Sequence, residues 1–116
     1  MEAPETLVRA RAEEIYARIA AAAHRTGRDP SRVTLMAAVK TRGLAEVAGT
    51  VKAGVTSIGE NRVQEGLGHL QALDAELRMR CRFHFIGRLQ ANKARKALSA
   101  FDSLDSLDDP DLVRRL

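Results

Sequence analysis

The sequence predicts an α/β fold in which short parallel strands alternate with helices. Its apolar runs are short and nearly continuous, which is typical of strands buried on both faces of a parallel sheet. Segments with apolar residues at helical spacing follow these runs, so that a strand–helix pair occurs four times after a first helix. This alternation fits two architectures, an open doubly wound sheet or the first half of a (β/α)8 barrel.

The first helix is predicted from apolar residues that recur at steps of three and four between Leu7 and Ala23. Charged residues occupy much of the rest of this segment, so the helix is amphipathic. Gly27 is a favourable residue at the end of such a helix, and Pro30 prevents its continuation.

The strands are predicted where short apolar runs are bounded by glycine or polar residues. They are Val33–Val39, Val55–Ile58, Cys81–Ile86 and Phe101–Leu104. Helices are predicted after them over residues 44–53, 63–77 and 92–100. A last helix begins with Asp109 as N-cap and Pro110 at the first helical position. Parallel strands joined in this way have right-handed crossovers.

Length and composition agree with one domain over residues 1–116. Hydrophobic residues make up 45% of the chain and charged residues 29%, which is an ordinary globular composition. A complete barrel takes about 250 residues, so this chain is expected to form the N-terminal half of one. The first and last strands of half a barrel are sheet edges with unpaired backbone groups, which predicts self-association.

The composition also disfavours several classes of function. The lone Cys81 cannot build a disulfide framework, and such sparing use of cysteine predicts a reducing, cytoplasmic location. The histidines and Cys81 lack metal-ligand spacing, so no metal site is predicted. No apolar stretch is long enough to span a membrane. The pI is near 9.8, but aromatic residues make up only 3%, so nucleic-acid binding is not predicted.

Functional groups in such folds gather at the carboxyl ends of the strands, and Lys40 directly follows the first strand. At the rim of an apolar core the charged form of a lysine is disfavoured, and a neutral amine can form a Schiff base with an aldehyde. A lysine that extends into solvent is the alternative interpretation.

Two further candidates follow or lie within the next strands. Asn61, after Gly59, offers a donor and an acceptor to a ligand, or it caps the helix that follows. His84 lies between two phenylalanines, so it points either into a barrel interior or toward the helix layer. A lone histidine is more often a structural hydrogen-bonding residue than a catalyst.

Three segments resemble the pyridoxal phosphate homeostasis protein family: Ala38–Thr41, Gly59–Glu65 and His84–Lys93. The resemblance implies a (β/α)8 barrel related to the N-terminal domain of alanine racemase, truncated here to the first helix and about four βα units. It also implies pyridoxal 5′-phosphate (PLP) bound as a lysine Schiff base. Lys40 matches the Schiff-base lysine, and Asn61 and His84 match motif positions at the cofactor-facing end.

The resemblance implies a role in intracellular PLP (vitamin B6) homeostasis, and it assigns no catalytic residue. Two alternatives stay open, a PLP-dependent racemase-like enzyme and a truncated fragment that does not bind the cofactor. The sequence departs from the family pattern at Val39, where a hydroxyl residue commonly precedes the lysine. The second half of the barrel, with its phosphate-binding residues, is also expected to be missing.

Overall fold

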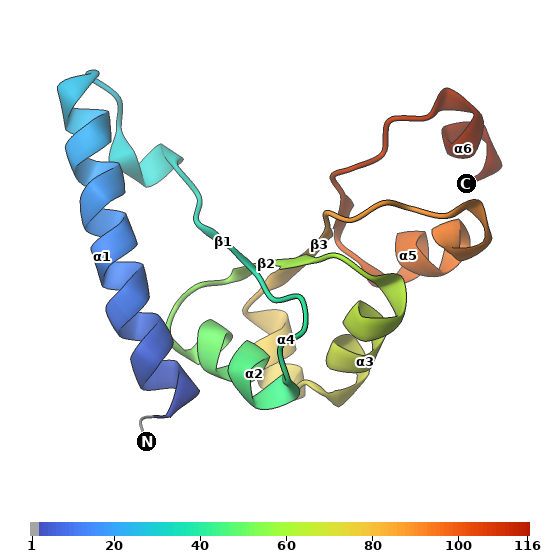
Figure 1. The fold of residues 1–116 in the computed structure, drawn as a ribbon, viewed down its shortest axis with the longest axis horizontal. Helices are drawn as coiled ribbons and strands as arrows, with labels where there is room; N and C mark the ends of the chain where they lie inside the picture. The colour runs from blue at the N-terminus through green and yellow to red at the C-terminus, as the bar shows by residue number, and fades with distance from the viewer. Residues whose placement is uncertain (1–2) are drawn as a thin grey trace.

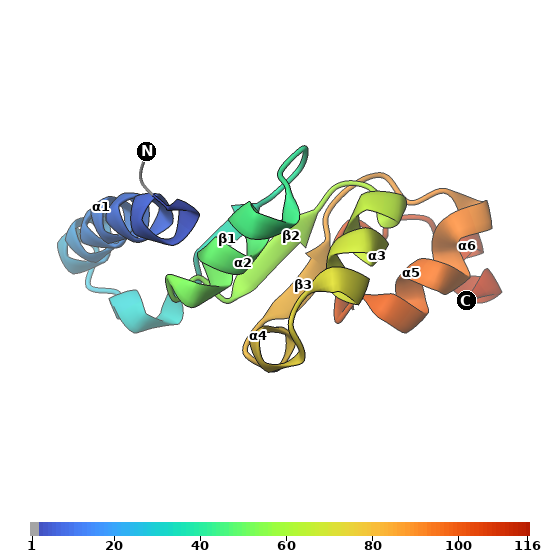
Figure 2. The same ribbon diagram turned by 90° about the horizontal axis from the view of Figure 1, so that it is seen from below.

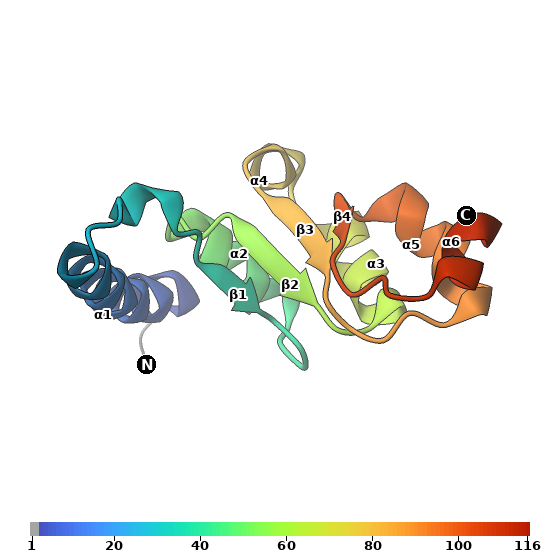
Figure 3. The ribbon, with the colours of Figure 1, turned by 90° about the horizontal axis from the view of Figure 1, so that it is seen from above.

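The computed structural model describes residues 3–116, in which four parallel strands form one sheet in the order β1-β2-β3-β4. The strands are β1 Met36–Ala38, β2 Ser57–Glu60, β3 Arg82–Phe85 and β4 Ser103–Leu104. Figure 3 shows them side by side in this order. The prediction of an α/β fold with parallel strands is confirmed.

Six α-helices accompany these strands within the described part of the chain. They are α1 Pro4–Arg25, α2 Leu44–Lys52, α3 Val63–Ala72, α4 Ala75–Met79, α5 Ala94–Ala100 and α6 Pro110–Arg115. Short 3-10 turns precede β1 and α5, at Pro30–Arg32 and Ala91–Lys93. Asp109 caps α6 through its side chain, which accepts a hydrogen bond from the backbone N–H of Asp111, as predicted.

The arrangement of helices and strands decides between the two predicted architectures. In Figure 1, α2, α3 and α4 lie below β1, β2 and β3, and the upper side of these strands is open between α1 and α6. The view from below in Figure 2 shows the helices in front of the sheet. A doubly wound sheet reverses its strand order and carries helices on both faces, whereas a barrel wall keeps sequential order with helices outside. The chain has the barrel arrangement.

The predicted helix 63–77 is wrong in one respect, because the structure divides it into α3 and α4. Leu73 leaves the helical conformation with φ −69° and ψ 135°. The side chain of Asp74 then accepts a hydrogen bond from Glu76 N at 3.0 Å and begins α4. Leu73 and Leu77 are both buried, so the apolar stripe continues across the break. The spacing of leucines alone therefore did not reveal the interruption.

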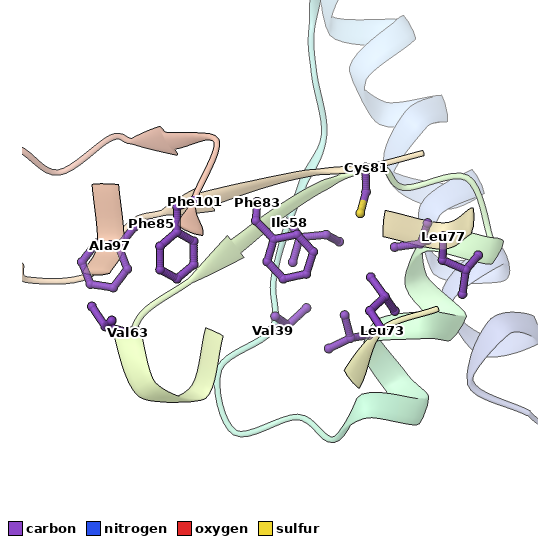
Figure 4. Packing of buried hydrophobic residues seen from close by; sticks show 12 residues of the cluster. Val39, Ile58, Val63, Leu73, Leu77, Cys81, Phe83, Phe85, Ala97 and Phe101 are labelled. Carbon is purple, nitrogen blue, oxygen red and sulfur yellow. The ribbon is translucent and has the colours of Figure 1, made fainter. Parts of the chain in front are cut away.

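The hydrophobic core lies between the sheet and the helices below it. Ile58, Phe83 and Phe85 project from β2 and β3 to this side, and each is at most 1% exposed. Figure 4 shows Ile58 and Phe83 pointing toward Val39 and Leu73. Full burial of such a side chain stabilises the fold by about 1.5–3 kcal/mol. This layer fixes which face of each strand is turned inward.

The opposite face of the sheet follows from the strand register. Met36, Ser57 and Arg82 form one row across β1, β2 and β3. The next row contains Ala38, Gly59, His84 and Ser103. Because side chains alternate along a strand, both rows face away from the core. We call this side the open face.

No helix within residues 3–116 is both long and apolar enough to cross a membrane.

Candidate functional site

Lys40 follows β1 at the carboxyl end of the open face. The strand ladder continues to Val39, whose N–H donates to Gly59 O at 3.0 Å, and the Val39 side chain is 4% exposed. Lys40 itself is exposed. The expectation that this lysine is partly desolvated by the core is therefore wrong for this structure. Its amine is instead accessible to a ligand from solvent.

The turn after Lys40 has an unusual backbone. Thr41 has φ +64°, and no other residue except glycine has a positive φ in the described part of the chain. A β-branched residue in this region is a conformational outlier. Such conformations persist only where the surrounding structure holds them, and they concentrate at functional sites.

Asn61 occupies the position after β2 that corresponds to Lys40 after β1. Its side-chain Oδ1 is buried and has no hydrogen-bond partner within residues 3–116. The N-cap of α3 is Arg62, and α3 has no side-chain cap, so the interpretation of Asn61 as a helix cap is wrong. Buried polar atoms almost always have partners, and an unpartnered one indicates a place for a ligand or a water.

His84 points to the open face, opposite the buried phenylalanines. Its Nδ1 lies 3.2 Å from Asp105 Oδ2, and its Nε2 lies 3.0 Å from Ser57 Oγ. Because a carboxylate only accepts hydrogen bonds, Nδ1–H donates to Asp105, and in the neutral ring Nε2 accepts from the hydroxyl of Ser57. The Ser103 hydroxyl, and after it His84, hold the pKa of the Asp105 carboxyl below its ordinary value. Both His84 nitrogens thus have protein partners.

The structure brings the three predicted site residues onto one face but not into mutual contact. Ala38, Gly59 and His84 are register partners, and Lys40 and Asn61 follow the first two by two residues. Lys40 and Asn61 therefore lie one step closer than His84 to the carboxyl edge of the sheet. Among residues 3–116, no hydrogen bond joins any two of the three.

A hollow on the open face lies on the other side of His84. Met36, Ser57 and Arg82 line it together with His84, and it extends to Thr34 and other residues near the amino ends of the strands. Lys40 and Asn61 do not line it. The carboxyl edge and this hollow are therefore separate features of the same face.

A buried cluster beneath the Lys40 turn was not identified from the sequence. Glu60 is fully buried, and its Oε2 lies 2.6 Å from Nδ1 of His69. Burial raises the pKa of Glu60, and the hydrogen bond with His69 offsets part of this effect. Glu65 and His69 are four residues apart and so share one face of α3. That spacing was the available signal in the sequence, but it does not indicate which residue of β2 lies opposite Glu65 and His69.

The same cluster has the donor set of a cation site. Oxygen atoms of Glu60 and Glu65 and a nitrogen of His69 lie within 4.8 Å of one another. Nevertheless, Nδ1 of His69 contacts Glu60, and Nε2 donates to the carbonyl of Arg42 at 3.0 Å. Since both ring nitrogens have protein partners, the geometry favours a hydrogen-bond network.

Comparison with known proteins gives close sequence relatives. The chain is 39% identical over 82 residues to the pyridoxal phosphate homeostasis protein of Escherichia coli (strain K12), an alignment that covers 71% of this chain and 35% of the relative. It is 45% identical over 82 residues to the pyridoxal phosphate homeostasis protein of Pseudomonas aeruginosa PAO1, covering 71% and 34%. The chain is homologous to the pyridoxal phosphate homeostasis proteins. It matches about a third of the length of these relatives, and no protein-family model matches it.

Solved structures agree with this relationship. A crystal structure of an unknown protein from Bifidobacterium adolescentis superimposes with a TM-score of 0.88 at 34% identity, covering 99% of this chain and 50% of that one. PipY of Synechococcus elongatus PCC7942, solved with PLP bound, gives a TM-score of 0.63 at 34% identity, covering 87% and 46%. The predicted family resemblance is confirmed, and the chain corresponds to about half of each solved structure.

Proposed function

We propose that this chain binds PLP at the carboxyl edge of the open face, with Lys40 as the covalent anchor, and serves intracellular PLP homeostasis. The homologues named for PLP homeostasis and the PLP-bound PipY structure support this proposal. The observation that carries it is that the exposed Lys40 and the unpartnered Oδ1 of Asn61 lie at the ends of two adjacent strands.

The chemistry of these groups fits an aldehyde cofactor. The neutral amine of Lys40 attacks the aldehyde carbon of PLP, a carbon–nitrogen double bond forms, and one water molecule leaves. Asn61 presents an oxygen that can accept a hydrogen bond from a protonated or hydroxyl group of the ligand. His84 lies one step further from the carboxyl edge, and its role in the site is to orient Ser57 and Asp105.

Residues 1–116 serve, in this proposal, as the N-terminal half of a PLP-binding barrel. In phosphate-binding barrels the anion is frequently held after strands seven and eight. The four strands described here supply the lysine edge and not that region. We therefore expect residues 1–116, taken by themselves, to discriminate little between PLP and pyridoxal, which lacks the phosphate.

Binding is favoured over racemisation by the state of His84. A racemase needs a second acid/base group opposite the lysine. His84 is the residue on this face that could serve, but both of its nitrogens are engaged by Ser57 and Asp105. We accordingly propose a carrier or regulatory role, in the cytoplasm that the single cysteine predicts.

Absorption spectroscopy of the 116-residue chain tests the proposal. Addition of PLP is expected to give the visible band of a protonated Schiff base, and Lys40→Ala removes that band. Lys96→Ala is the matched control, because Lys96 is also exposed but lies on α5. A band of equal strength in Lys40→Ala, or no band in the folded wild-type chain at saturating PLP, contradicts the proposal.

The sheet edges support a second proposal, that isolated copies of this chain associate. β1 and β4 are the terminal strands of the described sheet, and each is hydrogen-bonded to a neighbour on one side only. Such edges are templates for pairing with another chain. Light scattering on the purified chain should show dimers or larger species, and a monodisperse monomer at all accessible concentrations contradicts this expectation.

A further inference from the structure

The turn that carries Lys40 is held from below by α3. Glu65 accepts the backbone N–H of Thr41 on its Oε1 at 2.8 Å. His69, one helical turn later, donates Nε2–H to the carbonyl of Arg42 at 3.0 Å. The two side chains therefore fix the peptide group that follows Lys40 and the peptide group that follows Arg42. Hydrogen bonds to a charged partner are stronger than those between neutral groups, which makes the Glu65 contact the stronger of the two.

His69 is itself fixed by a third residue. A carbonyl only accepts hydrogen bonds, so Nε2 carries a proton, and the contact of 2.6 Å between Nδ1 and Glu60 Oε2 contains one further proton. Glu60 belongs to β2 and is fully buried. The imidazole of His69 thus contacts Glu60 of the sheet through Nδ1 and the Arg42 carbonyl of the turn through Nε2.

This network accounts for the backbone of Thr41. A threonine with φ +64° does not adopt this conformation unassisted, because its branched side chain disfavours it. Inside the turn, Arg42 N–H donates to Val39 O at 3.0 Å. Glu65 and His69 of α3 add two further contacts to the backbone of this turn.

We propose that Glu65 and His69 are positioning residues for Lys40, holding the Lys40–Arg42 turn so that the lysine amine lies over the carboxyl edge of the open face. The proposal rests on the proposed function for its consequence, the reaction of Lys40 with PLP. Its structural part, that these two side chains hold the turn, is measurable in the chain without cofactor.

Two pairs of variants separate holding of the turn from general support of the fold. Glu65→Gln keeps an oxygen that can accept the Thr41 N–H, whereas Glu65→Ala removes it. His69→Gln places its amide nitrogen near the position of Nε2 and keeps the donor to Arg42 O. His69→Asn places its amide near Nδ1, so it keeps a partner for Glu60 and loses the donor to Arg42 O.

The first readout is amide hydrogen exchange of Thr41 and Arg42 in the folded chain without PLP. Glu65→Ala removes the acceptor of the Thr41 N–H, and His69→Asn releases the Arg42 carbonyl, so that the turn closed by Arg42 N–H and Val39 O opens more often. Each variant should accelerate exchange on the order of tenfold, the factor that corresponds to one lost hydrogen bond. Glu65→Gln and His69→Gln should stay within about twofold of wild type. The holding role is overturned if the two Glu65 variants accelerate exchange equally, if the two His69 variants do so, or if no variant accelerates it.

The second readout is the rate at which PLP with borohydride modifies Lys40, and it should follow the same order of variants. Thr41→Gly adds a rescue that a purely structural role does not predict. Glycine adopts positive φ without strain, so Thr41→Gly in the Glu65→Ala chain should restore part of the lost labelling rate.

The two readouts fail in different ways. Absence of Lys40 labelling in the wild-type chain contradicts the proposed function, and the exchange pattern still decides whether α3 holds the turn. Labelling that is fast in all variants, with exchange unchanged, overturns the positioning proposal while the proposed function stands.

Discussion

The two faces of the sheet differ although they alternate along the same strands. Phe83 in β3 is fully buried against the helices, whereas its neighbours Arg82 and His84 face the open side, where Arg82 is exposed and His84 half-buried. The helix-covered face is apolar and closely packed, and the open face carries polar groups and the Lys40 edge. Along each strand, substitutions at core-facing positions are therefore expected to change stability, and substitutions at the alternate, open-face positions are expected to change ligand binding.

The largest expected effect is a test of that separation in two adjacent residues. Phe83→Ala should lower the free energy of unfolding by about 3–5 kcal/mol, because it leaves a cavity in the core. Arg82→Ala, one residue earlier on the open face, should change it by less than about 0.5 kcal/mol. Urea denaturation followed by circular dichroism measures both, and equal effects of the two substitutions would refute the division of faces.

A second pair of variants compares the two sides of α3. A Cβ on Gly66 would lie 2.7 Å from Cε1 of Phe101, so Gly66→Ala should destabilise the fold by about 1–3 kcal/mol through overpacking. Gly68, two residues later, is exposed and has nothing within 4 Å of an added Cβ. Gly68→Ala should stabilise by roughly 0.5–1 kcal/mol, since alanine favours helix. Thermal denaturation shows the sign of each change, and the same sign for both contradicts the packing described.

The smallest expected effect is the pH dependence contributed by Glu60. Burial raises the pKa of Glu60 in the folded chain above its ordinary value of 4.5, so the folded state binds more protons than the unfolded state between the two pKa values. The contribution of Glu60 to stability is fully present below pH 4.5 and is lost as pH rises through the folded pKa.

The difference in unfolding free energy between wild type and Glu60→Gln isolates this contribution. Urea denaturation measures it from about pH 4 to about pH 8. The free energy of unfolding of the wild-type chain should decrease relative to that of Glu60→Gln as pH increases. If the wild-type chain instead became more stable relative to Glu60→Gln over this interval, the effect of His69 on the pKa of Glu60 would outweigh the effect of burial.

The sequence predicted much of the fold because the hydrophobic pattern and turn residues determine it locally. The four strands, α1, α2 and the Asp109-Pro110 start of α6 all follow from such signals. The break between α3 and α4 was missed because Leu73 and Leu77 keep the helical apolar spacing across it. A stripe of leucines reports burial on one side and not the continuity of the backbone.

The candidate site was predictable in part, for a related reason. The carboxyl ends of parallel strands meet at one edge, which places Lys40 and Asn61 correctly. The direction of His84 required knowing that Phe83 and Phe85 face the helices. The contacts of Glu60 with His69 and of Glu65 with Thr41 depend on how α3 lies against the strand ends. Sequence spacing contains no information about that packing.

The most direct test of PLP binding at the carboxyl edge of the open face is a peptide map of the chain after reduction with borohydride in the presence of PLP. The sequence offers four lysines to PLP: Lys40, Lys52, Lys93 and Lys96. At low stoichiometry of PLP, mass spectrometry after reduction and digestion should find the phosphopyridoxyl group predominantly on Lys40. Equal distribution over all four lysines, or preferential modification of one of the others, would contradict the assignment of Lys40 as the anchor.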